Sequence, residues 1–203
     1  MKSIEDTLKT AKELINAAGE QVEIALAGGI AVLSHGVERT TRDVDFYLFA
    51  KAIQESGSAS FFERLRAALP ERFAARLEKG SAADAGAFAN DVIFIEDRLG
   101  EYLRLDLIIA RYKWELEAIR SARPVPGLLL PVITKPYLAA MKLRAGSYQD
   151  AADVQELVRL MSEDEKEELK RLARRLGRER NLERLLAGPE PDEVHEPANE
   201  RLY

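Results

Sequence analysis

The sequence contains no cysteine and only two histidines, His35 and His195, among its 203 residues. The absence of cysteine excludes disulfide bonds, thiolate zinc sites and cysteine nucleophiles. With two histidines, a metal site built from several imidazoles is excluded as well.

The sequence also lacks a long apolar run and an excess of positive charge. No segment approaches the roughly 20 apolar residues that span a bilayer. The N-terminus, Met1–Asp6, has no apolar signal region, so a cytoplasmic protein without a membrane partner is expected. A net charge of −5 gives no general attraction to nucleic acid. The composition, 46% hydrophobic and 32% charged, is typical of a soluble globular protein.

Helical and strand patterns alternate over the first two thirds of the chain. Ser3 and Asp6 form a capping-box pattern before a helical apolar stripe that runs to residue 18. Further helices are predicted over 29–34, 60–69 and 111–121. Strands are predicted over 22–27, 43–49, 91–96 and 102–109, with an irregular or edge strand near 73–77 and an extended segment over 125–133.

From Thr134 onward the pattern is helical. Thr134 can cap a helix to residue 146, and Ser147 can cap the next, to residue 161. Ser162 begins a third capping-box pattern, and helix propensity continues to about residue 186. We therefore expect an α/β (α+β) core over 1–133, a helical region over 134–187 and a disordered acidic tail over 188–203.

A double glycine followed by two aspartates is the most informative feature. An apolar run leads into Gly28 and Gly29, and a later extended run opens with Asp43 and Asp45. Glycines let the backbone approach a ligand closely, and a helix beginning there would face a phosphate. Asp43 and Asp45 share a strand face and need a cation between them, usually a hard divalent ion such as Mg²⁺. The alternative is a solvated strand end.

Asp106 is a candidate third carboxylate. It lies mid-strand, on the opposite face from Leu105 and Leu107. A charge inside a sheet costs on the order of several kcal/mol unless it is paired or metal-bound. Asp106 could therefore complete a metal site or accept the proton of an attacking hydroxyl. The alternative is pairing with Arg104, two residues earlier on the same face.

Lys142 lies at the edge of the apolar face of its predicted helix, so its stem can be buried while its ammonium reaches a cleft. Lys142 or Arg144 is the best-placed cation for a triphosphate, although a snorkelling surface lysine is the alternative. Asp150 and Asp153 share a helix face, and Asp150 could serve instead as a helix cap.

Two further groups of basic residues could contact phosphate. Arg39 and Arg42 flank the loop before the aspartates, where they would contact phosphate or neutralise the carboxylates. Residues 169–186 hold seven basic and two acidic side chains. A solvated helix is the default interpretation of that segment. The functional alternative is a surface for RNA phosphates that the acidic tail shields.

These motifs resemble a known family. The Gly28–Gly29 pair, the run from Arg39 to Asp45 and the later Asp106 resemble the nucleotidyltransferase superfamily, with its DNA polymerase beta-like fold. Lys142 and Arg144, followed by the run Tyr148–Asp153, resemble the second motif of AbiEii-type toxins. The resemblance covers roughly residues 20–160 and implies a mixed sheet flanked by helices. The chain departs from the family in having Gly-Gly where Gly-Ser is frequent, and Gln149 where a basic residue is typical.

The resemblance implies roles for individual residues. The residues expected to bind metal and to act in catalysis are Asp43, Asp45 and Asp106. Those expected to bind the nucleotide are Gly28, Gly29, Arg42, Lys142 and Asp150. The implied cofactor is Mg²⁺ or Mn²⁺.

The activity implied is transfer of a nucleoside monophosphate from a nucleoside triphosphate to tRNA or a protein, with release of pyrophosphate. The protein would be the toxin of a type IV-like toxin–antitoxin pair with a cognate antitoxin. Two alternatives stay open at this point. One is a small-molecule nucleotidyltransferase of the antibiotic-modifying kind. The other is a catalytically silent module of the same fold that binds RNA or protein.

Overall fold

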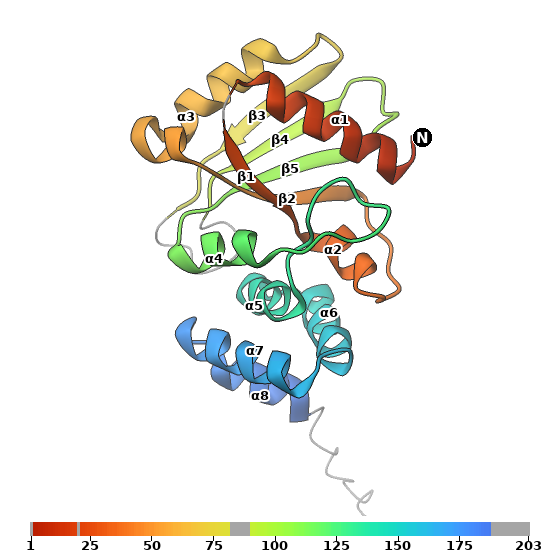
Figure 1. The fold of residues 1–203 in the computed structure, drawn as a ribbon, viewed down its shortest axis with the longest axis vertical. Helices are drawn as coiled ribbons and strands as arrows, with labels where there is room; N and C mark the ends of the chain where they lie inside the picture. The colour runs from red at the N-terminus through yellow and green to blue at the C-terminus, as the bar shows by residue number, and fades with distance from the viewer. Residues whose placement is uncertain (1, 20, 82–89, 188–203) are drawn as a thin grey trace, which may run out of the picture.

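The computed structural model describes residues 2–19, 21–81 and 90–187 of the chain. A five-stranded mixed sheet forms the centre of its first part, with strand order β1-β2-β5-β4-β3 (Figure 1). The strands are β1 (Val22–Leu26), β2 (Asp43–Ala50), β3 (Phe73–Glu78), β4 (Val92–Asp97) and β5 (Arg104–Ile109). The central pair, β2 and β5, is parallel, and the other neighbouring strands are antiparallel. The expected α/β fold with a mixed sheet is confirmed.

The two faces of the sheet differ because side chains alternate along each strand. Val44, Phe46 and Leu48 of β2 are fully buried, as is Leu107 of β5. Helices α1 (Ile4–Ala17) and α3 (Lys51–Ala68) lie on one side of the sheet in Figure 1, and α4 (Lys113–Ser121) and α5 (Lys135–Ala145) on the other. The polar residues of β2 and β5 lie on the face opposite Phe46.

The remaining helices are α2 (Gly28–Ser34), α6 (Tyr148–Arg159), α7 (Glu163–Arg175) and α8 (Glu179–Ala187). Capping boxes at Ser3, Ser147 and Ser162 begin α1, α6 and α7, as the sequence predicts. Thr134 is at the N-cap position of α5, but its side chain makes no cap hydrogen bond within the described chain. Its Oγ1 lies instead 3.2 Å from Ser121 Oγ, so Thr134 has the predicted cap position without a capping side-chain bond.

Two predicted boundaries are corrected. Helix α3 begins at Lys51 rather than near residue 60 and bends at Gly57, which adopts φ +79°. The segment 125–133, predicted to be extended, pairs through isolated bridges at Val132. The helical pattern after residue 162 is divided at Gly177, whose φ of +65° ends α7. Glycines in the left-handed conformation interrupt helices that apolar periodicity alone would join.

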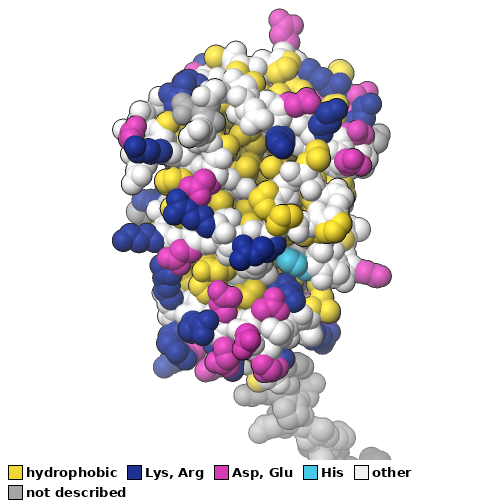
Figure 2. All heavy atoms as spheres, viewed as in Figure 1, with side chains coloured by type: hydrophobic (Ala, Val, Ile, Leu, Met, Phe, Trp, Pro, Cys, Tyr) yellow, Lys and Arg dark blue, Asp and Glu magenta, His cyan; other side chains and the backbone are white. Residues whose placement is uncertain are grey.

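Most of the described basic side chains near the C-terminus have partners. Lys170, Arg174 and Arg175 pair with Glu167, Glu179 and Glu117. Figure 2 shows acidic and basic side chains intermixed over the helical half on the face in view. This pairing favours the solvated-helix interpretation of residues 169–186. The predicted tail, 188–203, lies outside the described residues, and the division of the chain at residue 133 stays a prediction. Among the described helices, none is long and apolar enough to cross a membrane.

Candidate active site

The bend between β1 and α2 closes onto Asp45. The Ala27 N–H donates to the Asp45 carbonyl at 2.9 Å, and the Gly29 N–H donates to the Asp45 carboxylate. Gly28 adopts φ +54°, and a β-carbon there would lie 1.7 Å from Asp45 Oδ2. A residue with a side chain cannot occupy position 28 without displacing this carboxylate. The double glycine is therefore explained by close approach of the backbone to Asp45.

Strand register gathers the three predicted aspartates. In the parallel β2–β5 pair, Asp45 lies opposite Asp106 and Asp43 lies opposite Arg104. Burial, together with the negative charges of Asp43 and Asp106, raises the pKa of Asp45 to about 6. Burial also raises the pKa of Asp106. The three carboxylates therefore repel one another, which favours a cation among them.

Arg104 lies between two of these carboxylates. Its Nε and Nη2 donate to the two Asp106 carboxylate oxygens at 2.6 and 2.7 Å. The same Nη2 donates to Asp43 Oδ2 at 3.1 Å. Planar two-point contacts of this kind are strong and geometrically specific. Arg104, which the sequence offers as the alternative partner of Asp106, is thus part of the site.

Helices α5 and α6 supply the opposite wall. Lys142 Nζ lies 2.7 Å from Asp150 Oδ1 and 3.0 Å from Asp153 Oδ2. Arg39 also pairs with Asp153, whose side chain is 1% exposed. Burial acts to raise the pKa of Asp150, but the contacts with Lys142 and Ser147 hold that pKa below its usual value. Lys142 is therefore held in place by fixed carboxylates rather than free at the surface.

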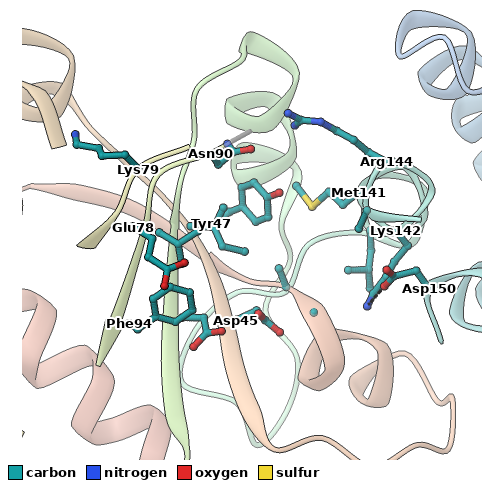
Figure 3. A pocket seen from close by; sticks show the side chains of 17 residues that line it. Asp45, Tyr47, Glu78, Lys79, Asn90, Phe94, Met141, Lys142, Arg144 and Asp150 are labelled. Carbon is teal, nitrogen blue, oxygen red and sulfur yellow. Dashed lines mark hydrogen bonds and ion pairs between the residues drawn. The ribbon is translucent and has the colours of Figure 1, made fainter. Parts of the chain in front are cut away.

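A cavity of ≈ 280 Å³ lies between the sheet and these helices. Figure 3 shows Asp45 and Phe94 on the sheet side and Lys142 and Asp150 on the helix side. Tyr47, Met141 and Asn90 also line the cavity. Burial raises the pKa of Tyr47, so its hydroxyl stays protonated. The cavity lining thus combines carboxylates, cationic side chains and uncharged side chains.

Nearly all of the predicted site residues meet at this cavity. Those that line it are Gly28, Asp45, Asp106, Lys142 and Asp150. Asp43 and Gly29 join the site through Arg104 and through the Asp45 carboxylate. Among the described residues, Arg42 is exposed and outside the cavity lining, so its role stays a prediction.

Tyr47, Asn90 and Glu115 were not predicted from the sequence, whereas Arg144, which contacts Glu115, was a candidate cation. Asn90 donates to both carboxylate oxygens of Glu115, at 3.1 and 3.0 Å, and Arg144 Nη1 donates to Glu115 at 2.6 Å. Tyr47 could have been predicted to lie at the site, because it follows Asp45 by two residues and therefore shares its strand face. The contacts of Glu115 could not have been predicted, because they join segments far apart in the sequence.

The residues present suit a hard divalent cation by their chemistry. Such cations prefer carboxylate oxygens, and the pKa of Asp45 is raised first by its burial and then by the negative charges of Asp43 and Asp106. Within residues 2–19, 21–81 and 90–187, no three His, Asp or Glu side chains are arranged to hold a metal ion as they stand. Arg104 lies between Asp43 and Asp106 and pairs with both.

The fold and the family assignment now agree on a class of protein. A mixed sheet that presents aspartates from a parallel strand pair to a glycine bend defines a nucleotidyltransferase. A family model described as "Nucleotidyl transferase AbiEii toxin, Type IV TA system" matches residues 12–203. The chain belongs to this family, which confirms the resemblance found in the sequence.

Solved structures with a similar arrangement have low sequence identity. JHP933 from Helicobacter pylori is 15% identical, with a TM-score of 0.43 over 94% of this chain and 86% of that chain. An antigenic nucleotidyltransferase-like protein from Paracoccidioides brasiliensis is 15% identical, with a TM-score of 0.45 over 90% and 93%. The antibiotic-resistance factor ANT(2'')-Ia is 16% identical, with a TM-score of 0.42 over 89% of each chain. No curated protein sequence matches the chain significantly.

Proposed function

We propose that the protein transfers a nucleoside monophosphate from a nucleoside triphosphate to an acceptor hydroxyl, with Mg²⁺ or Mn²⁺ as cofactor and pyrophosphate as the second product. The observation that carries this proposal is the register that sets Asp45 opposite Asp106 beside the Gly28 bend. Carboxylates with raised pKa values that face a cavity are typical of sites built for chemistry rather than for stability.

The chain's own residues would divide the work as follows. Asp43, Asp45 and Asp106 would hold the divalent cation, which when bound supplies charge neutralisation for the phosphates. Asp106 would also accept the proton of the attacking hydroxyl. A bond would form between that oxygen and the α-phosphorus as the bond to the pyrophosphate oxygen breaks.

Lys142 would bind the triphosphate. Its ammonium lies at the cavity in contact with Asp150 and Asp153, and its side chain is 13% exposed. A lysine fixed in this way pays little conformational entropy when it contacts a phosphate. Gly28 and Gly29 would let the backbone approach the phosphates, and Asp150 would position Lys142. Catalysis would then rest mainly on positioning and charge neutralisation.

The family description supports a toxin of a toxin–antitoxin pair. We therefore propose that the acceptor is tRNA or a protein and that a cognate antitoxin is encoded next to this gene. Expression of the chain alone should then arrest growth, and co-expression of the neighbouring reading frame should relieve the arrest. Asp45→Ala should remove the toxicity, and persistent toxicity of that variant would contradict an enzymatic cause.

The activity is tested by incubating the protein with each labelled triphosphate, Mg²⁺ and cell lysate. Label should enter one macromolecular fraction, and its sensitivity to nuclease or protease identifies the acceptor class. Transfer should vanish in Asp43→Ala and Asp45→Ala but persist in Glu96→Gln, which removes an exposed carboxylate of β4. Label transfer that survives in both aspartate variants would refute the proposed site.

A further inference from the structure

Arg104 occupies the place where the proposed function needs a metal ion. We propose that Arg104 is a built-in counter-ion that a divalent cation must displace, so that this side chain sets how tightly the aspartates bind metal. The inference rests on the proposed function, because it concerns the same three carboxylates. It assigns Arg104 a positioning role that the motifs of the sequence do not indicate.

Arg104 contacts the carboxylates at oxygens that a metal ion could bind. One guanidinium donates to both oxygens of Asp106 and to one oxygen of Asp43. Each of these oxygens is one that a metal would need, because hard cations bind carboxylate oxygens directly. Arg104 lies between Asp106 and Asp43 and contacts both through charge-assisted hydrogen bonds. A metal ion that joins these two carboxylates would therefore compete with Arg104 for the same space and the same negative charge.

The negative charge of the three carboxylates exceeds the positive charge of Arg104. Three carboxylates share one guanidinium, and Asp45 accepts a backbone N–H instead of an Arg104 donor. The positive charge of Lys142 acts to lower the pKa of Asp45, but Lys142 forms its ion pairs with Asp150 and Asp153. Arg104 thus compensates the cluster only in part. A dication carries twice the charge and can approach all three carboxylates.

The Arg104 side chain has room to move. Its side chain is 38% exposed, so the released guanidinium can regain water. It also lies 5.2 Å from the centre of the Phe94 ring, which Arg76 contacts as well. A movement that frees the carboxylates can keep this aromatic contact. The released cation would then stand beside the cavity that Phe94 lines.

The two positions of Arg104 make metal affinity a population effect. When only a fraction of molecules has free carboxylates, the apparent Kd rises in inverse proportion to that fraction. Metal that arrives with a triphosphate can compensate, because the phosphates supply oxygen ligands and the freed guanidinium gains an anion. Arg104 would then disfavour metal binding to the empty protein and favour the metal–nucleotide pair.

The matched control is Arg76. Its guanidinium lies over the same Phe94 ring, 4.0 Å from the centre, and it pairs with Glu78. It acts on Asp106 through its charge rather than through a hydrogen bond. Arg76→Gln therefore removes a neighbouring positive charge of the same type without freeing the Asp106 oxygens.

The experiment is calorimetric titration of Mn²⁺ into the full chain without nucleotide. A pH of about 8 keeps the solution about two units above the Asp45 pKa of about 6, so protons do not compete. Arg104→Gln should lower the Kd for Mn²⁺ about tenfold, whereas Arg76→Gln should change it less than about twofold. Arg104→Lys, which keeps the charge but loses the planar contact, should fall between wild type and Arg104→Gln. Circular dichroism confirms that each variant is folded.

The outcomes separate this inference from the proposed function. Tighter Mn²⁺ binding in Arg104→Gln, lost again when Asp45→Asn is added, would support the inference. Unchanged or weaker binding by folded Arg104→Gln would overturn it and leave the proposed activity standing. Absence of Mn²⁺ binding in every variant, with or without triphosphate, would overturn both and favour a binding module in which Arg104 replaces the metal.

Discussion

Two groups of charged side chains face each other across the cavity, and they differ in charge balance. The helix cluster consists of Arg39, Lys142, Asp150 and Asp153. The sheet cluster consists of Asp43, Asp45, Asp106 and Arg104. The helix cluster has two charges of each sign, whereas the sheet cluster has three negative charges and one positive.

The pKa values of one carboxyl from each cluster shift in opposite directions. Asp150 of the helix cluster has a lowered pKa despite its burial, because Lys142 and Ser147 contact it. The pKa of Asp45 in the sheet cluster is raised to about 6, first by its burial and then by the negative charges of Asp43 and Asp106. The balanced cluster is complete and stabilises the fold, while the unbalanced cluster leaves net negative charge for a ligand. Removing one carboxylate from each cluster should therefore change stability in opposite directions.

The largest effect is expected from Asp153→Ala in the helix cluster. This variant leaves Lys142 and Arg39 facing each other without their shared, 1% exposed partner. Breaking a buried ion pair from one side typically costs about 3–5 kcal/mol. Urea unfolding should show that loss, and Asp164→Ala, an exposed aspartate in α7, should cost less than about 0.5 kcal/mol. A loss below about 1 kcal/mol for Asp153→Ala would mean that the helix cluster is not a stabilising unit.

The next effect disturbs the sheet cluster by sterics rather than charge. In Gly28→Ala the new methyl group would lie 1.7 Å from Asp45 Oδ2, at φ +54°. We expect a loss of about 2–4 kcal/mol, from backbone strain plus displacement of the carboxylate. Gly177→Ala is the matched control, because its φ is +65° and no described atom lies within 4 Å of the added carbon. It should cost about 1–2 kcal/mol in thermal unfolding. Equal losses would argue against close packing at the Gly28 bend.

Asp45→Asn should stabilise the protein while abolishing nucleotidyl transfer. The folded pKa of Asp45, about 6, lies above the ordinary value of 3.8. The folded state therefore binds more protons between those values, and the free energy of unfolding falls as pH rises through that window. Replacing the carboxylate should raise the free energy of unfolding by about 2 kcal/mol at about pH 8 and hardly change it near pH 4.

Chemical denaturation of both proteins at the two pH values measures this gain. Asp150→Asn is the comparison in the helix cluster. The Asp150 pKa is lowered, so its contribution is present above the unfolded pKa and lost as pH falls through the folded pKa. Asp150→Asn should thus be less stable than wild type at neutral pH. Destabilisation by Asp45→Asn at about pH 8 would contradict the unbalanced state of the sheet cluster.

The sequence predicted the parts of the site that are encoded locally. Period-two alternation places Asp43 and Asp45 on one face of their strand, and it likewise places Arg104 and Asp106 on a shared face of a later strand. Capping patterns located the starts of α6 and α7. These predictions depend on residues within one turn or one strand, so chain order is sufficient to make them.

The sequence could not predict how distant segments meet. The Arg104–Asp43 contact requires the β2–β5 register, which sets those residues opposite each other. The segment 125–133 has an extended pattern, yet it pairs with Leu26 through single backbone hydrogen bonds to Pro131 and Ile133 rather than as a strand of the sheet. Thr134 is a residue type that favours helix N-caps, but its hydroxyl lies near Ser121 instead of capping α5. In each case a tertiary partner overrides a local preference.

The smallest expected effect sharpens the claim that the helix cluster also positions Lys142. Ser147 Oγ accepts from the Asp150 backbone and lies 2.7 Å from Asp150 Oδ2, so it caps α6 and fixes the carboxylate that contacts Lys142. Ser162 caps α7 with the same motif. Ser147→Ala and Ser162→Ala should each cost about 1 kcal/mol of stability.

The two cap variants should differ in their kinetics. Ser147→Ala loosens Asp150 and through it Lys142, so the KM for the triphosphate should rise about two- to fivefold, because uniform substrate binding is weakened. Ser162→Ala should leave KM unchanged, since Glu165, the other member of its capping box, pairs with Lys135 rather than with Lys142. Equal KM values in both variants would mean that Lys142 is fixed by Asp153 alone. The helix cluster would then act as a rigid scaffold in which the Asp150 contact does not affect nucleotide binding.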